Sequence, residues 1–234
     1  MSINNTLIFT ATYNEVENIS TFIENIISQK LNTDIYIIDD NSPDNTSEII
    51  KSYSKKYPFI SYKIRSGKLG LDTAHKEAYY YAKINKYKKF ITMDADLSHD
   101  PKELSKFISL LDEFPFVIGS RYMAGGKNNM TFFRLFLSYF GNQLIKRLLK
   151  LPNTEFTTSY RGFNLEKLNK FELSSVSSKG YSFFMETIFR INYLGYQIKE
   201  IPITFEHRAR GKSKLPKIET LRTLKNIFIL MFKR

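Results

Sequence analysis

The feature that most constrains this chain is the alternation of short apolar segments with helical patterns over its first 120 residues. The apolar segments are rich in Ile, Phe, Val and Thr, as β-strands are. Between them, apolar residues recur at intervals of three and four, which is typical of amphipathic helices. We expect strands at 6–12, 34–39, 59–65, 89–93 and 116–119, with helices near 19–27, 44–57, 71–85 and 104–111. Repeated units of this length predict an α/β fold, a mostly parallel sheet with helices on both faces.

Polar side chains follow three of these strands at the point where each strand ends. They lie in the segments 13–15 (Tyr-Asn-Glu), 39–40 (Asp-Asp) and 94–96 (Asp-Ala-Asp). Ligands of open parallel sheets bind beyond the carboxyl ends of the strands. The sequence therefore predicts a binding site at one edge of the sheet, built from all three segments.

Asp94 and Asp96 are the strongest candidates for a metal site. Two carboxylates this close repel each other unless a cation neutralises them. Oxygen ligands without Cys favour Mg²⁺ or Mn²⁺ over zinc. The alternative is a plain helix start, because Ser98 and Asp100 can cap a helix that opens at Pro101. That alternative gives no role to Asp94 and Asp96.

The second half of the chain is strongly basic. Residues 1–118 carry 14 Lys and Arg against 16 Asp and Glu, a net charge of −2, whereas residues 119–234 carry 21 against 7, a net charge of +14. This asymmetry indicates an anionic partner: a phosphorylated substrate, an anionic membrane surface or a nucleic acid. A nucleic-acid-binding protein would explain the basic charge but not the acidic sheet edge, so we expect no nucleic-acid partner.

The elements of the second half are fewer and longer. We expect helices at 131–151, 181–193 and 215–234, a strand near 198–205 and a basic loop at 207–217. With 234 residues and no linker or repeat, the chain suits one domain. It has no Cys, no apolar run of about 18 to 20 residues and no basic start followed by an apolar run. We therefore expect no disulfide, membrane span or signal peptide.

Eight motifs in order resemble glycosyltransferase family 2, and within it the dolichol-phosphate mannosyltransferases and their bacterial polyprenyl-phosphate relatives. The motifs are 11–15 (ATYNE), 38–46 (IDDNSPDNT), 65–71 (RSGKLGL), 93–101 (MDADLSHDP), 119–122 (GSRY), 180–186 (GYSFFME), 200–205 (EIPITF) and 208–214 (RARGKSK). The resemblance implies the GT-A form of the α/β fold. It also implies one domain over 1–234, with a nucleotide-sugar-binding half at 1–120 and an acceptor-binding, membrane-facing half at 121–234.

The resemblance assigns the candidate residues to three ligands: a donor, a metal ion and an acceptor. The donor, a nucleotide sugar, would be bound by Ala11, Tyr13, Glu15, Asp39, Asp40, Lys68, Arg208 and Lys214. The metal, Mg²⁺ or Mn²⁺, would be held by Asp94 and Asp96, with Ser98 where the family often has Gln. The acceptor, a polyprenyl or dolichyl phosphate, would be bound by Arg121, Arg134, Ser138 and Ser213. Asp94, Asp96 and Arg121 are the predicted catalytic residues.

The reaction that this resemblance implies needs no general base, because a lipid phosphate is already an anion near neutral pH. We therefore expect structural roles for His75, His99 and His207. Departures from the family pattern, such as Ala11 for Pro and Glu155 at the start of 155–161, leave the sugar open. Mannose from GDP-mannose is the expected donor, and glucose or N-acetylhexosamine donors are the alternatives. A catalytically silent relative that binds lipid or a partner is the alternative of another class.

The helices at 131–151 and 215–234 combine large apolar side chains with Lys and Arg. That composition suits helices that lie in a membrane interface and are drawn to anionic lipid. We expect a peripheral protein on the cytoplasmic face of a membrane. The alternatives are ordinary core packing or docking on a membrane-spanning partner subunit.

Overall fold

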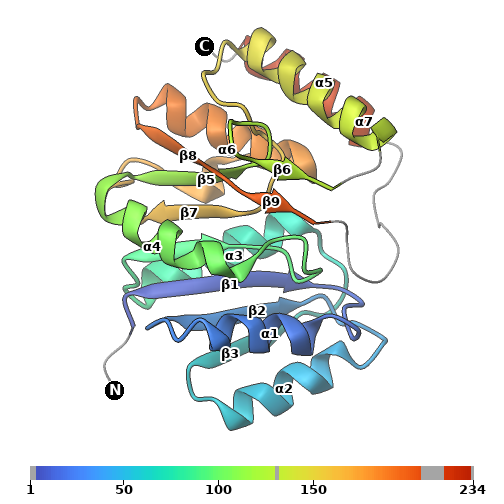
Figure 1. Cartoon of the computed structure of the whole chain (residues 1–234), viewed down its shortest axis with the longest axis vertical. Helices are drawn as coiled ribbons and strands as arrows, with labels where there is room; N and C mark the ends of the chain where they lie inside the picture. Colours follow the sequence, from blue (N-terminus) through green and yellow to red (C-terminus); the bar gives the residue numbers. More distant parts are fainter. Residues whose placement is uncertain (1–3, 130–131, 207–218, 233–234) are drawn as a thin grey trace.

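The computed structural model describes residues 4–129, 132–206 and 219–232 of the chain. Its centre is a seven-stranded sheet in the order β3-β2-β1-β4-β7-β5-β8 (Figure 1). The strands are β1 (Thr6–Thr12), β2 (Asp34–Asp39), β3 (Ile60–Ile64), β4 (Lys89–Thr92), β5 (Phe116–Ser120), β7 (Arg161–Asn164) and β8 (Ile198–Pro202). All neighbouring pairs are parallel except those of β7. The predicted α/β fold with a mostly parallel sheet is confirmed.

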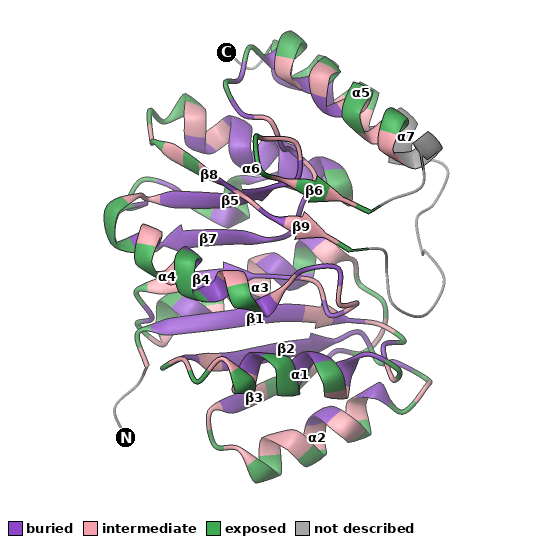
Figure 2. Ribbon diagram, in the orientation of Figure 1, coloured by how far each residue is buried: buried purple, intermediate pink, exposed green. Residues whose placement is uncertain are grey.

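Helices cover both faces of this sheet because the strands are apolar on both sides. In β1, Leu7 and Phe9 belong to one buried core and Ile8 to the other, as the two-residue period of a strand requires. The core that holds Ile8 packs against α1 (Ile19–Ser28), α2 (Thr46–Lys56) and α4 (Leu104–Glu113). The core that holds Phe9 packs against α3 (Leu71–Ile84), α5 (Phe132–Leu149), α6 (Tyr181–Tyr193) and α7 (Glu219–Met231). Figure 2 shows the buried strands between these two layers.

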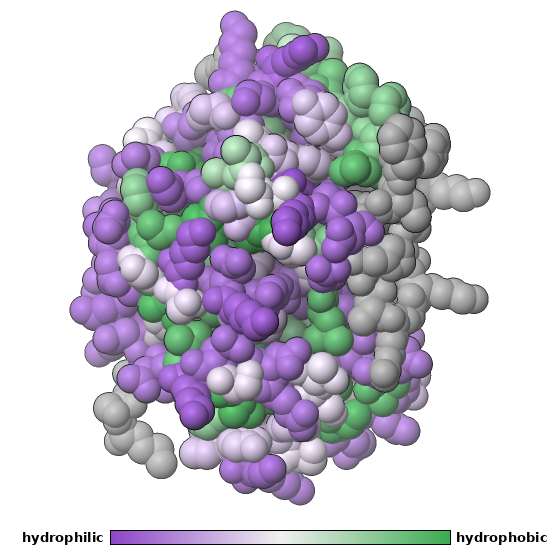
Figure 3. Space-filling view, viewed as in Figure 1, coloured by the Kyte–Doolittle hydropathy of each residue, from purple (hydrophilic) through white to green (hydrophobic). Residues whose placement is uncertain are grey.

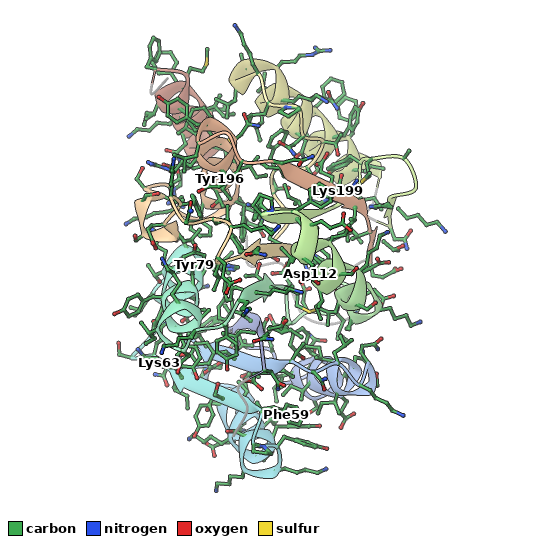
Figure 4. The ribbon with its side chains drawn as sticks, turned by 90° about the vertical axis from the view of Figure 1, so that its left-hand side faces the viewer. Phe59, Lys63, Tyr79, Asp112, Tyr196 and Lys199 are labelled. Atoms are coloured by element: carbon green, nitrogen blue, oxygen red, sulfur yellow. The ribbon has the colours of Figure 1, made fainter. Side chains whose placement is uncertain are left out.

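The side of α3 that faces the sheet shows how the second core is filled. Tyr79, labelled in Figure 4, meets Phe90 and Phe163 edge to face, with ring centroids 5.9 and 5.7 Å apart. Its hydroxyl donates to the carbonyl oxygen of Phe171 at 3.2 Å. Aromatic rings on the helix thus pack directly on aromatic residues of the central strands.

Strand β7 is the one element of the sheet that the sequence did not predict. It runs antiparallel between β4 and β5, with Phe163 paired to both Phe90 and Phe116. Its four residues, Arg-Gly-Phe-Asn, lack the apolar alternation of a strand. Gly162 is required there, because a Cβ atom at this position would lie 2.8 Å from the side chain of Leu111.

The predicted strand near 198–205 is divided in two. Residues 198–202 form β8 beside β5, whereas β9 (Thr204–Phe205) pairs with β6 (Lys127–Asn128) in a separate small sheet. The helices predicted at 131–151 and 181–193 are confirmed as α5 and α6, and α7 confirms the described part of the helix at 215–234. α7 packs against both α5 and α6 (Figure 1). The basic loop at 207–217 lies outside the described residues.

Candidate active site

The carboxyl ends of β1, β2 and β4 lie at one edge of the sheet, as the sequence predicted. Thr12 at the end of β1 pairs with Asp39 at the end of β2. On the other side of β1, Phe9 pairs with Thr92, and the backbone N–H of Met93 donates to the carbonyl oxygen of Phe9 at 3.1 Å. The segments 13–15, 39–40 and 94–96 therefore start from neighbouring strands at the same edge.

The side chain of Asp39 is held by hydrogen bonds within the protein at this edge of the sheet. Its carboxylate accepts hydrogen bonds from the hydroxyl of Thr12 at 2.7 Å and from the backbone N–H and hydroxyl of Ser42 at 2.8 and 2.6 Å. The side chain is buried. Asp39, and not Asp40, is thus the residue that organises the turn before Pro43.

Asp40 is the second buried carboxylate of the edge, and it forms an ion pair with Arg65. The guanidinium of Arg65 also donates to the hydroxyl of Thr73 at 2.7 Å and to the carbonyl oxygen of Gly70 at 3.1 Å. Burial raises the pKa of the Asp40 carboxyl above its ordinary value, and the hydrogen bond and charge of Arg65 oppose that rise. The pair thereby ties the loop 65–71 to the end of β2.

The structure brings the predicted donor residues Tyr13 and Lys68 together. The ammonium nitrogen of Lys68 lies 4.6 Å from the centre of the Tyr13 ring, a cation–π contact. Lys68 is exposed, and a Cβ atom at the neighbouring Gly67 would meet no heavy atom within 4 Å. The Lys68 ammonium is therefore accessible to an anionic ligand from solvent.

Glu15 and Ala11 contribute to the edge in different ways. Glu15 is buried, its carboxylate accepts from the side-chain amide of Asn18 at 2.9 Å, and its backbone N–H donates to the hydroxyl of Thr46 at 3.0 Å. Ala11 is half-buried in β1 opposite Ile38. Ala11 offers no polar side-chain atom, so any contact with a donor would come from its backbone or its methyl group.

Asp94 and Asp96 lie just beyond β4 with their side chains still accessible. The side chain of Asp94 keeps 40% of its surface exposed. Desolvation by the surrounding protein nevertheless raises the pKa of this carboxyl; His99 opposes the rise, and the carboxylates of Asp96 and Glu15 add to it. A bound cation would relieve this crowding of negative charge.

Ser98 and His99 hold this segment in place. The backbone N–H and hydroxyl of Ser98 both donate to Asp96, at 3.1 and 2.6 Å. The backbone N–H of Asp94 donates to Nδ1 of His99 at 3.0 Å, so Nδ1 carries no proton, and Nε2 lies 3.3 Å from the Thr158 hydroxyl. Burial lowers the pKa of His99, which agrees with a neutral ring. Asp100 also caps the helical turn at Pro101, through the N–H of Lys102.

The donor set at this segment fits Mg²⁺ or Mn²⁺. Both ions prefer oxygen ligands and keep positions for water and phosphate oxygens. Within residues 4–129, 132–206 and 219–232, no cluster of three or more His, Asp or Glu residues suited to a metal occurs. The protein would thus supply Asp94 and Asp96, while the predicted third ligand, Ser98, is buried and directs its hydroxyl to Asp96.

Arg121 lies at the end of β5 and is paired inside the protein. Its Nε donates to the carboxylate of Glu155 at 2.8 Å, and one terminal nitrogen donates to the hydroxyl of Thr157 at 2.9 Å. The guanidinium also lies over the ring of Phe205, 4.5 Å from its centre. Burial disfavours the charged form, but the Glu155 carboxylate more than compensates and raises the pKa of Arg121.

The other predicted acceptor residues fall partly outside the described structure. Ser138 lies on α5 and its hydroxyl accepts from that of Tyr122 at 2.6 Å, so it is held close to the Arg121 segment. Arg134 is also on α5, but its side chain is outside the described part. Arg208, Ser213 and Lys214 lie in the segment 207–218, which is not described.

The sequence did not identify three charged residues that organise the acceptor side, of which Glu155 and Arg161 are buried and Glu200 is half-buried. Glu155 accepts from Arg121 and from the N–H groups of Thr157 and Thr158. Glu200 accepts from the N–H groups of Thr154 and Glu155. Arg161 donates to three backbone carbonyl oxygens and lies over the ring of Phe184. The available signal is the segment 155–161 (EFTTSYR), in which a Glu, two Thr, a Ser and an Arg stand close together.

Comparisons with known proteins identify the family that this chain resembles in sequence. The family model for glycosyl transferase family 2 matches residues 7–171. The undecaprenyl-phosphate mannosyltransferase of Micrococcus luteus is 32% identical over 205 residues, 87% of this chain and 84% of the relative. The polyprenol monophosphomannose synthase of Mycolicibacterium smegmatis is 34% identical over 213 residues, 90% of this chain and 80% of the relative.

Two solved structures share the fold at low sequence identity. A mannosyltransferase from Pyrobaculum calidifontis, solved with GDP-mannose and Mn²⁺, has a TM-score of 0.66 and 17% identity. All of this chain is covered, but only 66% of that one. TarS residues 1–349 from S. aureus, solved with UDP-GlcNAc, has a TM-score of 0.62 and 15% identity over 96% of this chain and 66% of that one.

None of the helices within the described residues is both long enough and apolar enough to cross a membrane.

Proposed function

We propose that this chain, which belongs to glycosyl transferase family 2, transfers mannose from GDP-mannose to a polyprenyl or dolichyl phosphate with inversion at the anomeric carbon. The observation that carries this proposal is the accessible Asp94-Ala95-Asp96 segment, one strand away from the polar segment 13–15 at the same sheet edge. Relatives named for mannose transfer to lipid phosphates cover most of the chain. Their names supply the sugar and the acceptor of the proposal.

The residues of the sheet edge would bind the donor. Tyr13 and Glu15 would contact the nucleobase, and the Lys68 ammonium would approach the diphosphate. Because Asp39 and Asp40 are already bonded within the protein, their contribution would be to shape the base and ribose site. Arg208 and Lys214 remain predicted donor ligands on the resemblance alone.

Asp94 and Asp96 would hold Mg²⁺ or Mn²⁺, which when bound neutralises the donor diphosphate and stabilises the departing nucleotide. Ser98 would fix the orientation of Asp96 through its two hydrogen bonds. An oxygen of the acceptor phosphate forms the new bond to the anomeric carbon, while the bond from that carbon to the GDP oxygen breaks. The attacking oxygen is already an anion, so no residue has to remove a proton, and the neutral, buried His99 is consistent with that.

The acceptor phosphate would be received near Arg121, Arg134, Ser138 and Ser213. Arg121 forms an ion pair with Glu155. We therefore assign its guanidinium a fixed position in the wall of this site. Such a fixed cation still lowers the electrostatic cost of bringing two phosphates together. The Tyr122–Ser138 hydrogen bond would join this wall to α5.

The outer faces of α5 and α7 would lie on the membrane that contains the lipid acceptor. Large apolar side chains are exposed there, in the upper right of Figure 3. They are Phe136, Leu137, Tyr139, Phe140, Leu144 and Leu148 on α5, Leu224, Phe228, Ile229 and Met231 on α7, and Phe232 directly after α7. An apolar area of this kind marks an interaction site, and with Lys and Arg around it the area suits an anionic bilayer surface. The cytoplasmic face stays a prediction, and docking on a membrane-spanning partner subunit stays the alternative to direct binding of the membrane.

A donor-by-acceptor assay tests the proposal. Radiolabelled GDP-mannose, UDP-glucose and UDP-N-acetylglucosamine are each incubated with a polyprenyl phosphate and Mg²⁺ or Mn²⁺. We expect label in the lipid phase from GDP-mannose only, and none when EDTA is present. Transfer from a UDP-sugar instead would change the donor, and full transfer in EDTA would contradict the metal role.

A further inference from the structure

A charged pocket lies between α7 and the segment that precedes α6. Its volume is about 340 Å³. Lys179, Ser177 and Ser178 form one wall, while Arg222, Lys225 and Asn226 of α7 form the other. Lys179 and Lys225 are both exposed, so their ammonium groups are accessible from solvent.

The charge of this pocket is positive. Glu186 is the acidic residue among the lining residues. Its carboxylate accepts from the N–H of Ser178 at 2.7 Å and from Nε of Arg190 at 2.7 Å. Burial opposes its ionisation, but these hydrogen bonds outweigh burial and lower its pKa. The negative charge of Glu186 is thus already balanced by its own partners, and the exposed ammonium groups of Lys179 and Lys225 make the pocket attractive to an anion.

The geometry of α7 places this pocket beside the exposed apolar face. Arg222, Lys225, Asn226 and Ile229 follow the spacing i, i+3, i+4, i+7, so they share one stripe of the helix. Phe228 and Phe232 form the neighbouring stripe and are exposed. Ile227 and Leu230 are buried in the core, and Leu230 also contributes to the floor of the pocket. Going around α7, the face buried in the core is followed by the exposed apolar stripe, and the apolar stripe is followed by the stripe that lines the basic pocket.

We propose that this pocket binds the phosphodiester headgroup of an anionic phospholipid when the apolar stripe of α7 lies in the bilayer. A headgroup phosphate lies at the level where the acyl chains end, which is where a basic stripe next to an inserted apolar stripe must lie. Lys and Arg near such a surface each contribute to binding, and a volume of this size is in the range of small-molecule sites. The inference rests on the proposed function only for the membrane-facing orientation of α7.

A vesicle-binding experiment with matched variants tests the pocket. The double variant Lys179→Gln, Lys225→Gln removes two charges from the pocket. Its control, Lys55→Gln with Lys106→Gln, removes two exposed charges from α2 and α4. Co-sedimentation is measured with phosphatidylcholine vesicles, with and without phosphatidylglycerol. We expect the pocket variant to bind the anionic vesicles at least about tenfold more weakly than wild type, and the control to bind within about threefold of wild type.

The outcomes separate this inference from the proposed function. Equal losses in the pocket and control variants would show a diffuse charge effect and overturn the pocket. Thermal stabilisation by inorganic phosphate as large as that by glycerophosphoglycerol would identify a free-phosphate site and overturn the lipid assignment. Mannose transfer, measured separately in neutral detergent micelles, reports on the proposed function alone, so either result can fail without the other.

Discussion

The carboxyl ends of β4 and β5 are followed by side chains of opposite charge, the acidic Asp94 after β4 and the basic Arg121 after β5. Beyond β4, the side chain of Asp94 is 40% exposed and its carboxyl crowds other carboxylates. Beyond β5, the side chain of Arg121 is 7% exposed and its partner Glu155 is fully buried. Both residues lie in motifs, 93–101 and 119–122, that the family resemblance assigns to catalysis. The comparison shows that a charge at a strand end serves either a ligand or the fold, and that its exposure and partners decide which.

In the proposed reaction, the residues that follow β4 and those that follow β5 would therefore have different roles. The β4 end carries two partly exposed carboxylates close together, Asp94 and Asp96, which suits a metal that arrives with the donor. The β5 end carries a cation whose position is fixed by an internal ion pair, which suits a preorganised wall. Variants at the two ends should therefore fail in different ways.

The largest effect is expected at the β4 end. Asp96→Asn should lower kcat by at least about a thousandfold, since metal stabilisation of the leaving group contributes several kcal/mol. The folded structure should persist, because an Asn oxygen can still accept from Ser98. Asp100→Asn is the matched control: it lies in the same segment, keeps the capping oxygen and should retain activity. Circular dichroism, kcat and Mn²⁺-dependent shifts in Tm are the measurements, and an Asp96→Asn enzyme of normal activity would remove the metal role.

At the β5 end we expect a loss of stability before a loss of chemistry. Arg121→Met leaves Glu155 buried without its cation, which costs about 3–5 kcal/mol in the free energy of unfolding. Arg121→Met with Glu155→Gln removes both charges and should recover most of that stability. Urea unfolding of the single and double variants measures this coupling.

The same double variant then tests the acceptor role of Arg121. If the Arg121 charge helps to receive the acceptor phosphate, the stable double variant should still have a raised KM for the lipid phosphate and an unchanged KM for GDP-mannose. A double variant that is both stable and fully active would reduce Arg121 to a structural residue.

The sequence predicted the elements of the first half well because each was encoded locally. Strands such as 6–12 and 34–39 are apolar on both faces, and the helices between them have clear spacing. Strand β7 was missed because its position is set by contacts distant in the sequence: Gly162 leaves room for the Leu111 side chain, and Arg161 donates to the carbonyl oxygen of Phe184. A four-residue segment with Arg and Gly carries no local strand signal.

The sequence predicted where the candidate site lies, but not which hydrogen bonds and ion pairs its side chains form. The three polar segments do meet at one sheet edge, and Tyr13 does meet Lys68. The sequence could not show that Asp39 is bonded to Thr12, 27 residues away, or that Arg121 is paired with Glu155, 34 residues away. Those partners come together only through the tertiary fold, and they decide which charges remain for a ligand.

The smallest effect we predict concerns a titratable residue that is buried in the core, His75. His75 on α3 is buried against Phe9, Phe183 and Phe184, with ring centroids 5.1, 5.7 and 5.2 Å away. Burial, with a further contribution from the charge of Arg161, lowers the pKa of His75 to about 3. In the unfolded chain the pKa of a His is about 6.5, so on acidification the unfolded state binds this proton first. The contribution of His75 to stability is therefore complete above pH 6.5 or so and is lost as the pH falls toward the folded pKa.

His75→Phe removes this proton-binding difference while keeping an aromatic ring in the same core. At about pH 8 both proteins hold a neutral side chain here, so the difference in unfolding free energy reports packing alone. Between that pH and about pH 5, wild type should lose roughly 2 kcal/mol more than the variant, since the slope is about 1.4 kcal/mol per pH unit for one proton. His99 also has a lowered pKa, but it is present in both proteins and cancels in the comparison. Parallel stability curves for the two proteins would mean that His75 is protonated, or reached by water, in the folded state, and that this core is less closed than its aromatic packing indicates.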